Sequence, residues 1–258
     1  VMKKSKRIKK SNSWKIKQHR DQFFKKSKTL GYRSRASFKL IELNQKFKFI
    51  KKNSNLLDLG ASPGGWSQVA NKIITDGKIL SIDIKYMEPI KNVKFIKNDI
   101  FEENTKNKVK DYFNNELDII VSDMAADTTG SKSLDSIRTN QLCADIINFS
   151  KNILKPKGVL VSKLFMGEDF IEVKNLAKSV FKNVNFYKPD SSRRESKETY
   201  LHCKTLKTCY TRITNRYRIG PRTSIYRLTS TTIDRNIVIT PIPQHNISPC
   251  IGCNRINT

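Results

Sequence analysis

The sequence contains no run of about 18 consecutive apolar residues, which excludes a transmembrane helix of ordinary length. No apolar stretch of about 7–15 residues follows the N-terminal lysines, so we expect no secretory signal peptide. The five cysteines are odd in number and scattered or late, which argues against a secreted disulfide framework and favours a reducing compartment. Acidic residues are scarce, since 23 Asp and Glu stand against 50 Lys and Arg, for a net charge of +27. This excess favours a polyanionic partner, nucleic acid before any other.

The charge is unevenly distributed along the 258 residues, a length that fits one large domain with or without a tail. Residues 1–39 hold 15 basic residues and 1 acidic residue, whereas residues 40–205 hold 27 and 21. Residues 206–258 hold 8 basic residues and 1 acidic residue, and arginine replaces lysine as their main cation. We predict a basic nucleic-acid-binding arm over 1–34, a domain over 35–205 and a tail of unknown role over 206–258. A solvated leader is the alternative for the arm.

Short apolar runs alternate with amphipathic segments through the middle of the chain. The expected strands are 55–60, 78–84, 93–99, 117–123, 158–165, 184–187 and 199–203. The expected helices are 13–28, 65–74, 136–154 and 170–181. A further helix is expected after Ser34, which would cap it, because Ala36, Leu40, Leu43 and Phe47 form one apolar stripe. Alternation of this kind predicts a doubly wound α/β sheet, whose ligands bind beyond the carboxyl ends of the strands.

A glycine-rich loop follows the first expected strand. Gly60, Gly64 and Gly65 let the backbone turn sharply and approach a ligand, but the spacing lacks the second glycine of G-x-G-x-x-G, which disfavours a pyrophosphate site and a nucleotide-dependent oxidoreductase. Asp83 ends the second strand and can accept both hydroxyls of a ribose, and Asp99 ends the third and can accept an adenine amino group. Each aspartate alone could be a turn former. Together they favour a nucleoside without phosphates, and S-adenosylmethionine is the obvious candidate.

Two further strand ends carry unusual charged residues. Asp123 ends the fourth strand, and Lys163 lies within an otherwise apolar strand, where a lysine needs a carboxylate partner or a route to water. The two should face one another at the switch point of the sheet. Lys39 lies beside the apolar stripe of an early helix and could instead pair with Glu42. Glu198 opens the last strand and could instead be a surface residue in a charge run.

These segments resemble the FtsJ/RrmJ family of ribose 2′-O-methyltransferases, in particular its large-subunit ribosomal RNA branch. The resemblance covers roughly residues 13–205, and the matching stretches are 32–40, 58–68, 122–130, 163–167 and 189–200. It implies a Rossmann-like, class I fold dependent on S-adenosylmethionine, with a seven-stranded, mostly parallel sheet and helices on both faces. The sequence departs from the family pattern at Ala126, where proline is frequent, and at Ser62, where alanine is frequent.

The resemblance also assigns residues to the site. The Lys-Asp-Lys-Glu tetrad of the family falls on Lys39, Asp123, Lys163 and Glu198. The cofactor-binding positions are Gly60, Pro63, Gly64, Gly65, Trp66, Asp83, Asp99 and Asp123. No metal is implied.

The chemistry explains why such a tetrad is needed, because a ribose 2′-hydroxyl is a poor nucleophile at neutral pH. Lys163 is the candidate that orients and deprotonates this hydroxyl, for which its pKa would have to be depressed. Lys39 could be the cation that lowers this pKa and could steer a phosphate, while Asp123 holds Lys163 and Glu198 orients both lysines. Carboxylates raise the pKa of a lysine and cations lower it, so Lys163 as base and Lys163 as orienting group both stay open.

The RNA partner is expected to meet the arm and the loop before the last strand. Basic residues can bind phosphates and aromatic ones can stack on bases, and Phe23 and Phe24 have equal claims to stacking and to core packing. The predicted RNA-binding residues are Lys15, Lys17, Arg20, Arg33, Arg35, Arg193 and Arg194. The resemblance implies a uridine in the peptidyl-transferase region of large-subunit ribosomal RNA, on the assembled subunit. Methylation of transfer RNA and a non-catalytic role in ribosome assembly are the alternatives.

The remaining expectations concern surroundings and the tail. The pair Cys250 and Cys253, with His245 nearby, supplies only three local ligands, so we predict no zinc site. We expect a monomer with no membrane association and no stable protein partner. The expected location is the cytoplasm, or the mitochondrion if the source is eukaryotic.

Overall fold

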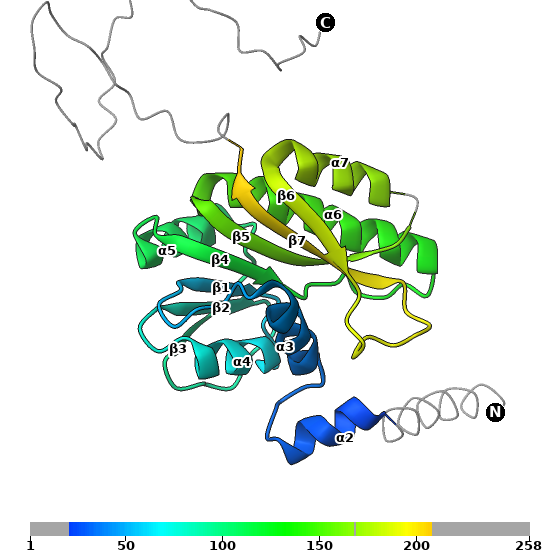
Figure 1. Ribbon diagram of the computed structural model, residues 1–258, viewed down its shortest axis with the longest axis horizontal. Coiled ribbons are helices and arrows are strands. Elements are labelled where there is room, and N and C mark those ends of the chain that lie inside the picture. The colour runs from blue at the N-terminus through cyan, green and yellow to red at the C-terminus, as the bar shows by residue number, and fades with distance from the viewer. Residues whose placement is uncertain (1–20, 168, 208–258) are drawn as a thin grey trace, which may run out of the picture. The chain divides into compact units, whose positions relative to one another are not determined.

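The computed structural model describes residues 21–167 and 169–207, and within them it forms one seven-stranded sheet (Figure 1). The strands are β1 (Leu56–Leu59), β2 (Ile79–Asp83), β3 (Val93–Lys97), β4 (Leu117–Ser122), β5 (Leu154–Phe165), β6 (Phe181–Tyr187) and β7 (Glu198–Leu206). Their order is β3-β2-β1-β4-β5-β7-β6. Strands from β3 to β5 pair in parallel, and β7 runs antiparallel to both β5 and β6. The predicted seven-stranded, mostly parallel sheet is confirmed.

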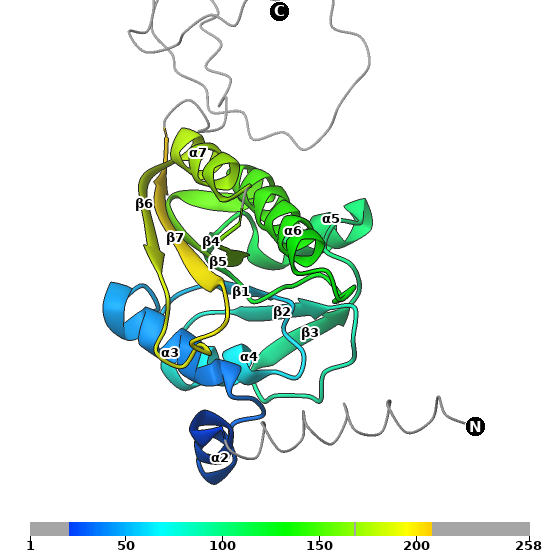
Figure 2. The ribbon, with the colours of Figure 1, turned by 90° about the vertical axis from the view of Figure 1, so that its right-hand side faces the viewer.

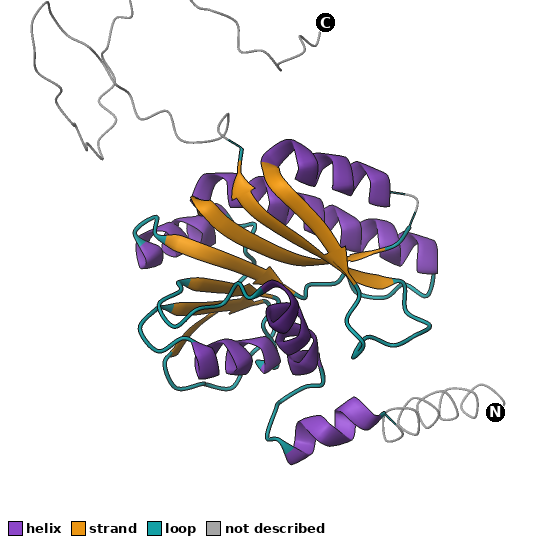
Figure 3. Ribbon diagram, viewed as in Figure 1, coloured by secondary structure: helices purple, strands orange, loops and turns teal. Residues whose placement is uncertain are grey.

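Helices cover both faces of the sheet, as Figures 2 and 3 show. They are α2 (Gln22–Thr29), α3 (Ala36–Phe47), α4 (Gly65–Ile73), α5 (Glu103–Phe113), α6 (Lys132–Ile153) and α7 (Phe170–Val180). Helices α5, α6 and α7 pack on one face and share a core with Leu57 and Leu59 of β1. Helices α3 and α4 pack on the other face, where Leu56 joins Leu40 and Leu43. This two-residue alternation along β1 is what a strand buried on both sides requires.

The junction of α3 and α4 corrects one expectation. Ser34 does not cap α3, because the helix begins at Ala36 after Arg35 and no side chain caps it. The Ser34 hydroxyl is buried without a hydrogen-bond partner, and a Cβ on Gly65 would lie only 2.3 Å from its oxygen. The serine is therefore a small residue that lets α3 approach the start of α4, and Gly65 is needed for the same contact.

The other differences concern the ends of elements. Helix α2 begins at Gln22, and Asp21 caps it by accepting from the backbone N–H groups of Phe23 and Phe24. The first part of the expected helix 13–28 and the tail from residue 208, with its cysteine pair, lie outside the described residues. Helix α5 was not expected from the sequence.

In residues 21–167 and 169–207, no helix has the length and apolar character to cross a membrane.

Candidate active site

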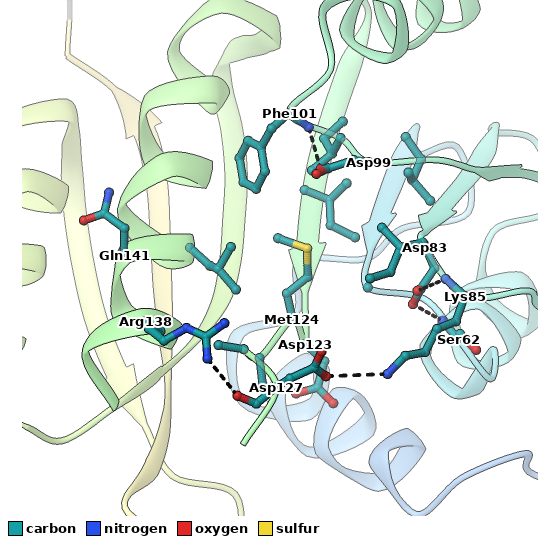
Figure 4. A pocket seen from close by; sticks show the side chains of 18 of the residues that line it. Ser62, Asp83, Lys85, Asp99, Phe101, Asp123, Met124, Asp127, Arg138 and Gln141 are labelled. Carbon is teal, nitrogen blue, oxygen red and sulfur yellow. Dashed lines mark hydrogen bonds and ion pairs between the residues drawn. The ribbon is translucent and has the colours of Figure 1, made fainter. Parts of the chain in front are cut away.

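A cavity of about 740 Å³ opens at the carboxyl ends of β1, β2 and β4 (Figure 4). This is the point where the strand order reverses, since β1 lies between β2 and β4. Four residues predicted to bind a cofactor line it, namely Gly60, Asp83, Asp99 and Asp123. Sequence reasoning missed its apolar walls, which include Met124, Ile84 and Phe101. Ile84 and Met124 directly follow Asp83 and Asp123, and Phe101 lies two residues after Asp99. No pattern in the sequence distinguishes these three apolar residues.

The carboxylates of Asp83 and Asp99 fix the loops on which they lie. Asp83 accepts from the backbone N–H groups of Ser62 at 2.8 Å and Lys85 at 2.7 Å, through different oxygens. Asp99 accepts from the N–H of Phe101 at 2.9 Å. These contacts are the turn-forming role considered from the sequence. They do not exhaust the carboxylates, because each oxygen can accept a second hydrogen bond, so both residues can still bind a ribose or an adenine amino group.

Gly60 brings the glycine loop against the segment that follows β4. Its φ of +71° lies in the left-handed region, and a Cβ there would lie 2.6 Å from Cγ of Met124. Only glycine allows this approach, which forms the floor of the cavity.

The other residues of the loop that were predicted to bind the cofactor do not line the cavity, namely Pro63, Gly64, Gly65 and Trp66. The Trp66 indole is buried between α3 and β7, donates to the Ala36 carbonyl at 2.8 Å, and packs 5.7 Å from the Tyr200 ring. Pro63 and Gly64 lie beside the Arg33 guanidinium, and Gly65 lies against α3. The structure thus gives Trp66 and Gly65 packing roles, and cofactor contacts from these four residues stay a prediction.

The four tetrad residues meet beside the cavity. Lys163 Nζ lies 3.0 Å from Asp123 Oδ1 and 3.7 Å from Glu198 Oε2. Lys39 Nζ lies 2.8 Å and 2.9 Å from the two carboxylate oxygens of Glu198. Two lysines and two carboxylates therefore alternate in one chain of contacts. Asp123 belongs both to this chain and to the cavity wall, so the tetrad adjoins the cavity directly.

Each tetrad residue comes from a different element. Lys39 lies on the first turn of α3, Asp123 directly follows β4, and Lys163 lies on β5. Glu198 begins β7, which pairs with β5, so Lys163 stands opposite Tyr200, two residues further along the same face. The alternative interpretations of Lys39 and Glu198 do not hold. Glu42 accepts from the backbone N–H groups of the loop before β7 rather than pairing with Lys39. Glu198 is not a surface residue, because it is only 8% exposed.

Electrostatics decides the charge of Lys163. Burial alone would lower the pKa of this lysine, but the charges and hydrogen bonds of Asp123 and Glu198 outweigh burial and raise it. Burial acts to raise the pKa of Asp123, but Lys163, Lys39 and the Tyr200 hydroxyl outweigh that effect and lower it. At neutral pH the described state therefore holds an ammonium at Lys163 and a carboxylate at Asp123. The sequence left open whether carboxylates or cations determine the pKa of Lys163, and in the structure the carboxylates do.

Two further residues hold the carboxylates, and sequence reasoning missed both. The buried Tyr200 hydroxyl donates to Asp123 Oδ1 at 2.7 Å, and the Ser192 hydroxyl donates to Glu198 Oε1 at 2.8 Å. Tyr200 could have been predicted from the sequence, because it lies two residues after Glu198 and residues two apart on a strand share a face. Ser192 lies in an irregular loop, where no periodicity predicts its direction.

Beneath the glycine loop, Asp58 is a buried carboxyl that the sequence did not single out. It is 1% exposed, accepts from the Ser67 hydroxyl at 2.6 Å, and belongs to the layer of α4. Burial, with smaller effects of the Asp123 and Asp83 charges, raises its pKa to about 7. Its folded-state pKa lies above the unfolded value of 3.8, so its stabilising effect is complete below pH 3.8 and is lost as the pH rises through 7.

We therefore expect Asp58→Asn to gain stability relative to the wild type as the pH rises. Between pH 5 and 8 the free energy of unfolding of the variant minus that of the wild type should increase by about 2–3 kcal/mol. Denaturant unfolding at both pH values measures this difference. Asp76→Asn, at an exposed carboxylate, is the matched control and should show no such change. A constant difference for Asp58→Asn would refute the raised pKa.

The residues predicted to bind RNA fall into three groups. Lys15, Lys17 and Arg20 lie outside the described residues. Arg193 and Arg194 are exposed on the loop before β7, and Arg193 Nε lies 3.9 Å from Asp21. Both side chains are solvent-exposed a few residues before Glu198, and their contact with RNA stays a prediction.

Arg33 and Arg35 instead make contacts within the protein. Arg35 pairs with Asp21 and donates to the Ser191 carbonyl, and the Arg33 guanidinium donates to backbone carbonyls of two loops. Phe23 lies 5.5 Å from the ring of Phe38, so it packs on the domain. Phosphate binding by the two arginines stays a prediction, but the structure already engages their donors.

Comparison with known proteins places these features in context. A family model for FtsJ-like methyltransferases matches residues 32–206. The chain is 45% identical to ribosomal RNA large subunit methyltransferase E of Pelagibacter ubique, over 76% of this chain and 97% of the relative. It is 44% identical to the protein of the same name in Rickettsia akari, over 76% of this chain and 89% of the relative. A crystal structure described as a ribosomal RNA methyltransferase of Plasmodium falciparum superposes with a TM-score of 0.61 at 35% identity, covering 68% of this chain and 98% of that one.

Proposed function

Because the chain belongs to the FtsJ-like methyltransferase family, we propose that it methylates the ribose 2′-hydroxyl of a uridine in large-subunit ribosomal RNA, on the assembled subunit. The enzyme is a methyltransferase that uses S-adenosylmethionine. The observation that carries the proposal is the position of Asp123, which lines the cavity and holds Lys163 at 3.0 Å. A methyl donor in the cavity and a hydroxyl at the tetrad would therefore be neighbours.

The cavity fits the cofactor. Asp83 and Asp99 offer carboxylate oxygens to a ribose and an adenine amino group, and Met124 and Phe101 offer apolar surface to the base. Asp123 offers a carboxylate to the methionine amine. When bound, S-adenosylmethionine supplies an electrophilic methyl group on a positively charged sulfur.

The tetrad acts on the nucleophile. Lys163 is cationic, so it donates a hydrogen bond that orients the ribose oxygen and stabilises negative charge that develops on it. Orientation of the reacting groups can lower a barrier by about 7–11 kcal/mol. As the ribose oxygen forms its new C–O bond, the methyl–sulfur bond of the donor would break and a neutral thioether would leave. The hydroxyl proton would pass to water, because a hydroxyl is strongly acidic once its oxygen is alkylated. Glu198 holds both lysines. The Lys39 side chain is 12% exposed, and a phosphate could reach it from that exposed part.

The basic regions support an RNA substrate. Residues 1–39 hold 15 basic residues and 1 acidic one, and Lys39 closes that stretch inside the tetrad. Arg193 and Arg194 are exposed in the loop before Glu198, and Arg193 Nε lies 3.9 Å from Asp21 at the start of α2, so this loop lies beside the basic N-terminal region. A ribose presented at the tetrad would have phosphate contacts from both segments.

The RNA substrate is tested by transfer of labelled methyl groups to three acceptors. We expect label in assembled large subunits, and little in free ribosomal RNA or in transfer RNA. Label in transfer RNA alone would assign the chain to a different substrate, and no transfer to any acceptor would favour a non-catalytic role in ribosome assembly.

The setting of the reaction is a further part of the proposal. We propose that the enzyme acts as a monomer, since the cavity and the tetrad are built from one chain. We propose a cytoplasmic location away from membranes, supported by the free, buried thiols of Cys143 and Cys203 and by the bacterial origin of the relatives from Pelagibacter ubique and Rickettsia akari. Residues 1–34 act as the RNA-binding arm, and the role of 206–258 stays open.

A further inference from the structure

Arg33 makes a set of contacts that a phosphate-binding residue does not need. Its Nη1 donates to the Pro63 carbonyl at 3.2 Å and to the Glu88 carbonyl at 2.5 Å, and its Nη2 donates to the Pro89 carbonyl at 2.9 Å. Its backbone N–H donates to the side chain of Gln68 on α4 at 2.8 Å. No ion pair joins Arg33 to a carboxylate in the part of the chain that the structure describes. The guanidinium therefore links two stretches of backbone.

Both stretches continue loops whose other residues line the cofactor cavity. Pro63 lies in the glycine loop, directly after Ser62, and Glu88 and Pro89 lie in the loop between β2 and β3, which begins with Ile84 and Lys85. Ser62 joins the same loops from the cavity side, because its N–H donates to Asp83 at 2.8 Å and its hydroxyl to the Tyr86 carbonyl at 3.0 Å. Arg33 and Ser62 thus fasten the two loops at different points.

We propose that Arg33 is a positioning residue of the cofactor site, which holds the glycine loop and the β2–β3 loop in register so that Asp83 meets the ribose. The proposal rests on the proposed function only in that the cavity binds S-adenosylmethionine.

The residue type fits this role. A guanidinium holds its donor nitrogens at a fixed spacing in a rigid plane, so Nη1 and Nη2 reach carbonyls on two segments at once, whereas a lysine ammonium donates from one point. Gly64 leaves the room that this contact needs, because a Cβ there would lie 2.9 Å from Arg33 Nη1. A phosphate contact has the opposite requirement, since it is largely electrostatic and lysine serves it well.

The test compares Arg33→Lys and Arg33→Gln with Arg194→Lys and Arg194→Gln, because Arg194 is exposed and predicted to meet RNA. Calorimetry measures the Kd for S-adenosylmethionine without RNA, and filter binding measures the Kd for ribosomal RNA. Both Arg33 variants should weaken cofactor binding about tenfold or more, and lysine should not rescue it. For Arg33→Lys, the affinity for ribosomal RNA should stay within about twofold of the wild-type affinity. Arg194→Gln should weaken RNA binding alone, and Arg194→Lys should restore it.

Two outcomes would overturn the proposal. One is unchanged cofactor affinity in Arg33→Gln together with lost RNA affinity that Arg33→Lys restores. The other is unchanged hydrogen exchange over residues 84–90 in Arg33→Lys, where release of the loop should make exchange faster and leave the strands unchanged. The exchange measurement also applies if Arg33→Gln does not fold. Because neither readout uses catalysis, a wild-type protein that binds the cofactor but methylates no ribosomal RNA would refute the proposed function and leave this inference standing.

Discussion

Alanine in place of Lys163 should abolish methyl transfer while the Kd for S-adenosylmethionine stays within about threefold. The lysine belongs to the tetrad and lies 3.0 Å from Asp123, so its loss removes the group that orients the ribose hydroxyl. Loss of orientation and of charge stabilisation together should lower kcat by about 10³-fold or more. Steady-state methylation at saturating large subunits measures this fall in kcat, and calorimetry measures cofactor binding.

Lys155→Ala is the matched control for this experiment. Lys155 lies on the same strand as Lys163, at its opposite end, where it pairs with Glu116 and Asp118 at 2.7 Å and 3.0 Å. A surface pair contributes little to stability, so we expect activity close to wild type. Turnover by Lys163→Ala at more than about a tenth of the wild-type rate would exclude the assigned role.

Asp123→Ala should have the largest combined effect on stability and activity. Its carboxylate is the acceptor for the Tyr200 hydroxyl at 2.7 Å and the nearest partner of the Lys163 ammonium. Removal leaves a buried cation with only Glu198 beside it, which typically costs about 3–5 kcal/mol. Denaturant unfolding should show this loss, and methyl transfer should disappear because the cavity wall and the tetrad share this residue.

A double variant separates stability from chemistry at the same position. In Asp123→Leu combined with Lys163→Met, no buried cation is left without its partner, and apolar replacement of a buried pair is often neutral or stabilising. We expect it to recover most of the stability lost in Asp123→Ala, with no recovery of methyl transfer. Recovery of both would mean that Asp123 acts through folding alone, and wild-type stability in Asp123→Ala would contradict the buried pair.

The sheet could be predicted from the sequence because its central strands are buried on both sides. The run Ile79–Asp83 has three apolar residues of five and Leu117–Ser122 has four of six, and turn residues bound both runs. Helix α5 escaped prediction because only Thr105, Val109 and Phe113 are buried among its charged residues. Such a sparse stripe gives weak amphipathic periodicity. Ser34 was wrongly predicted to cap α3. Serine is favoured at helix N-caps, but here its position is determined by the packing of α3 on α4.

The tetrad could be predicted as a set, but not its electrostatics. The order of Lys39, Asp123, Lys163 and Glu198 along the chain identified the residues, and the alternation of strands implied that Asp123 and Lys163 face one another. The charge of Lys163 depends on distances between four segments, which no local pattern contains. The same holds for Arg33 and Arg35, whose partners lie up to 156 residues away. Both arginines looked like phosphate contacts because the arm around them is basic.

Identification of the methylated nucleoside tests the assigned chemistry most directly. Large subunits methylated with labelled S-adenosylmethionine are digested to nucleosides, which are separated and analysed by mass spectrometry. A tetrad that orients a ribose oxygen predicts the label in 2′-O-methyluridine, with the added mass on the ribose fragment and none in the reaction of Lys163→Ala. Label on the uracil base, or equal label from Lys163→Ala, would contradict it.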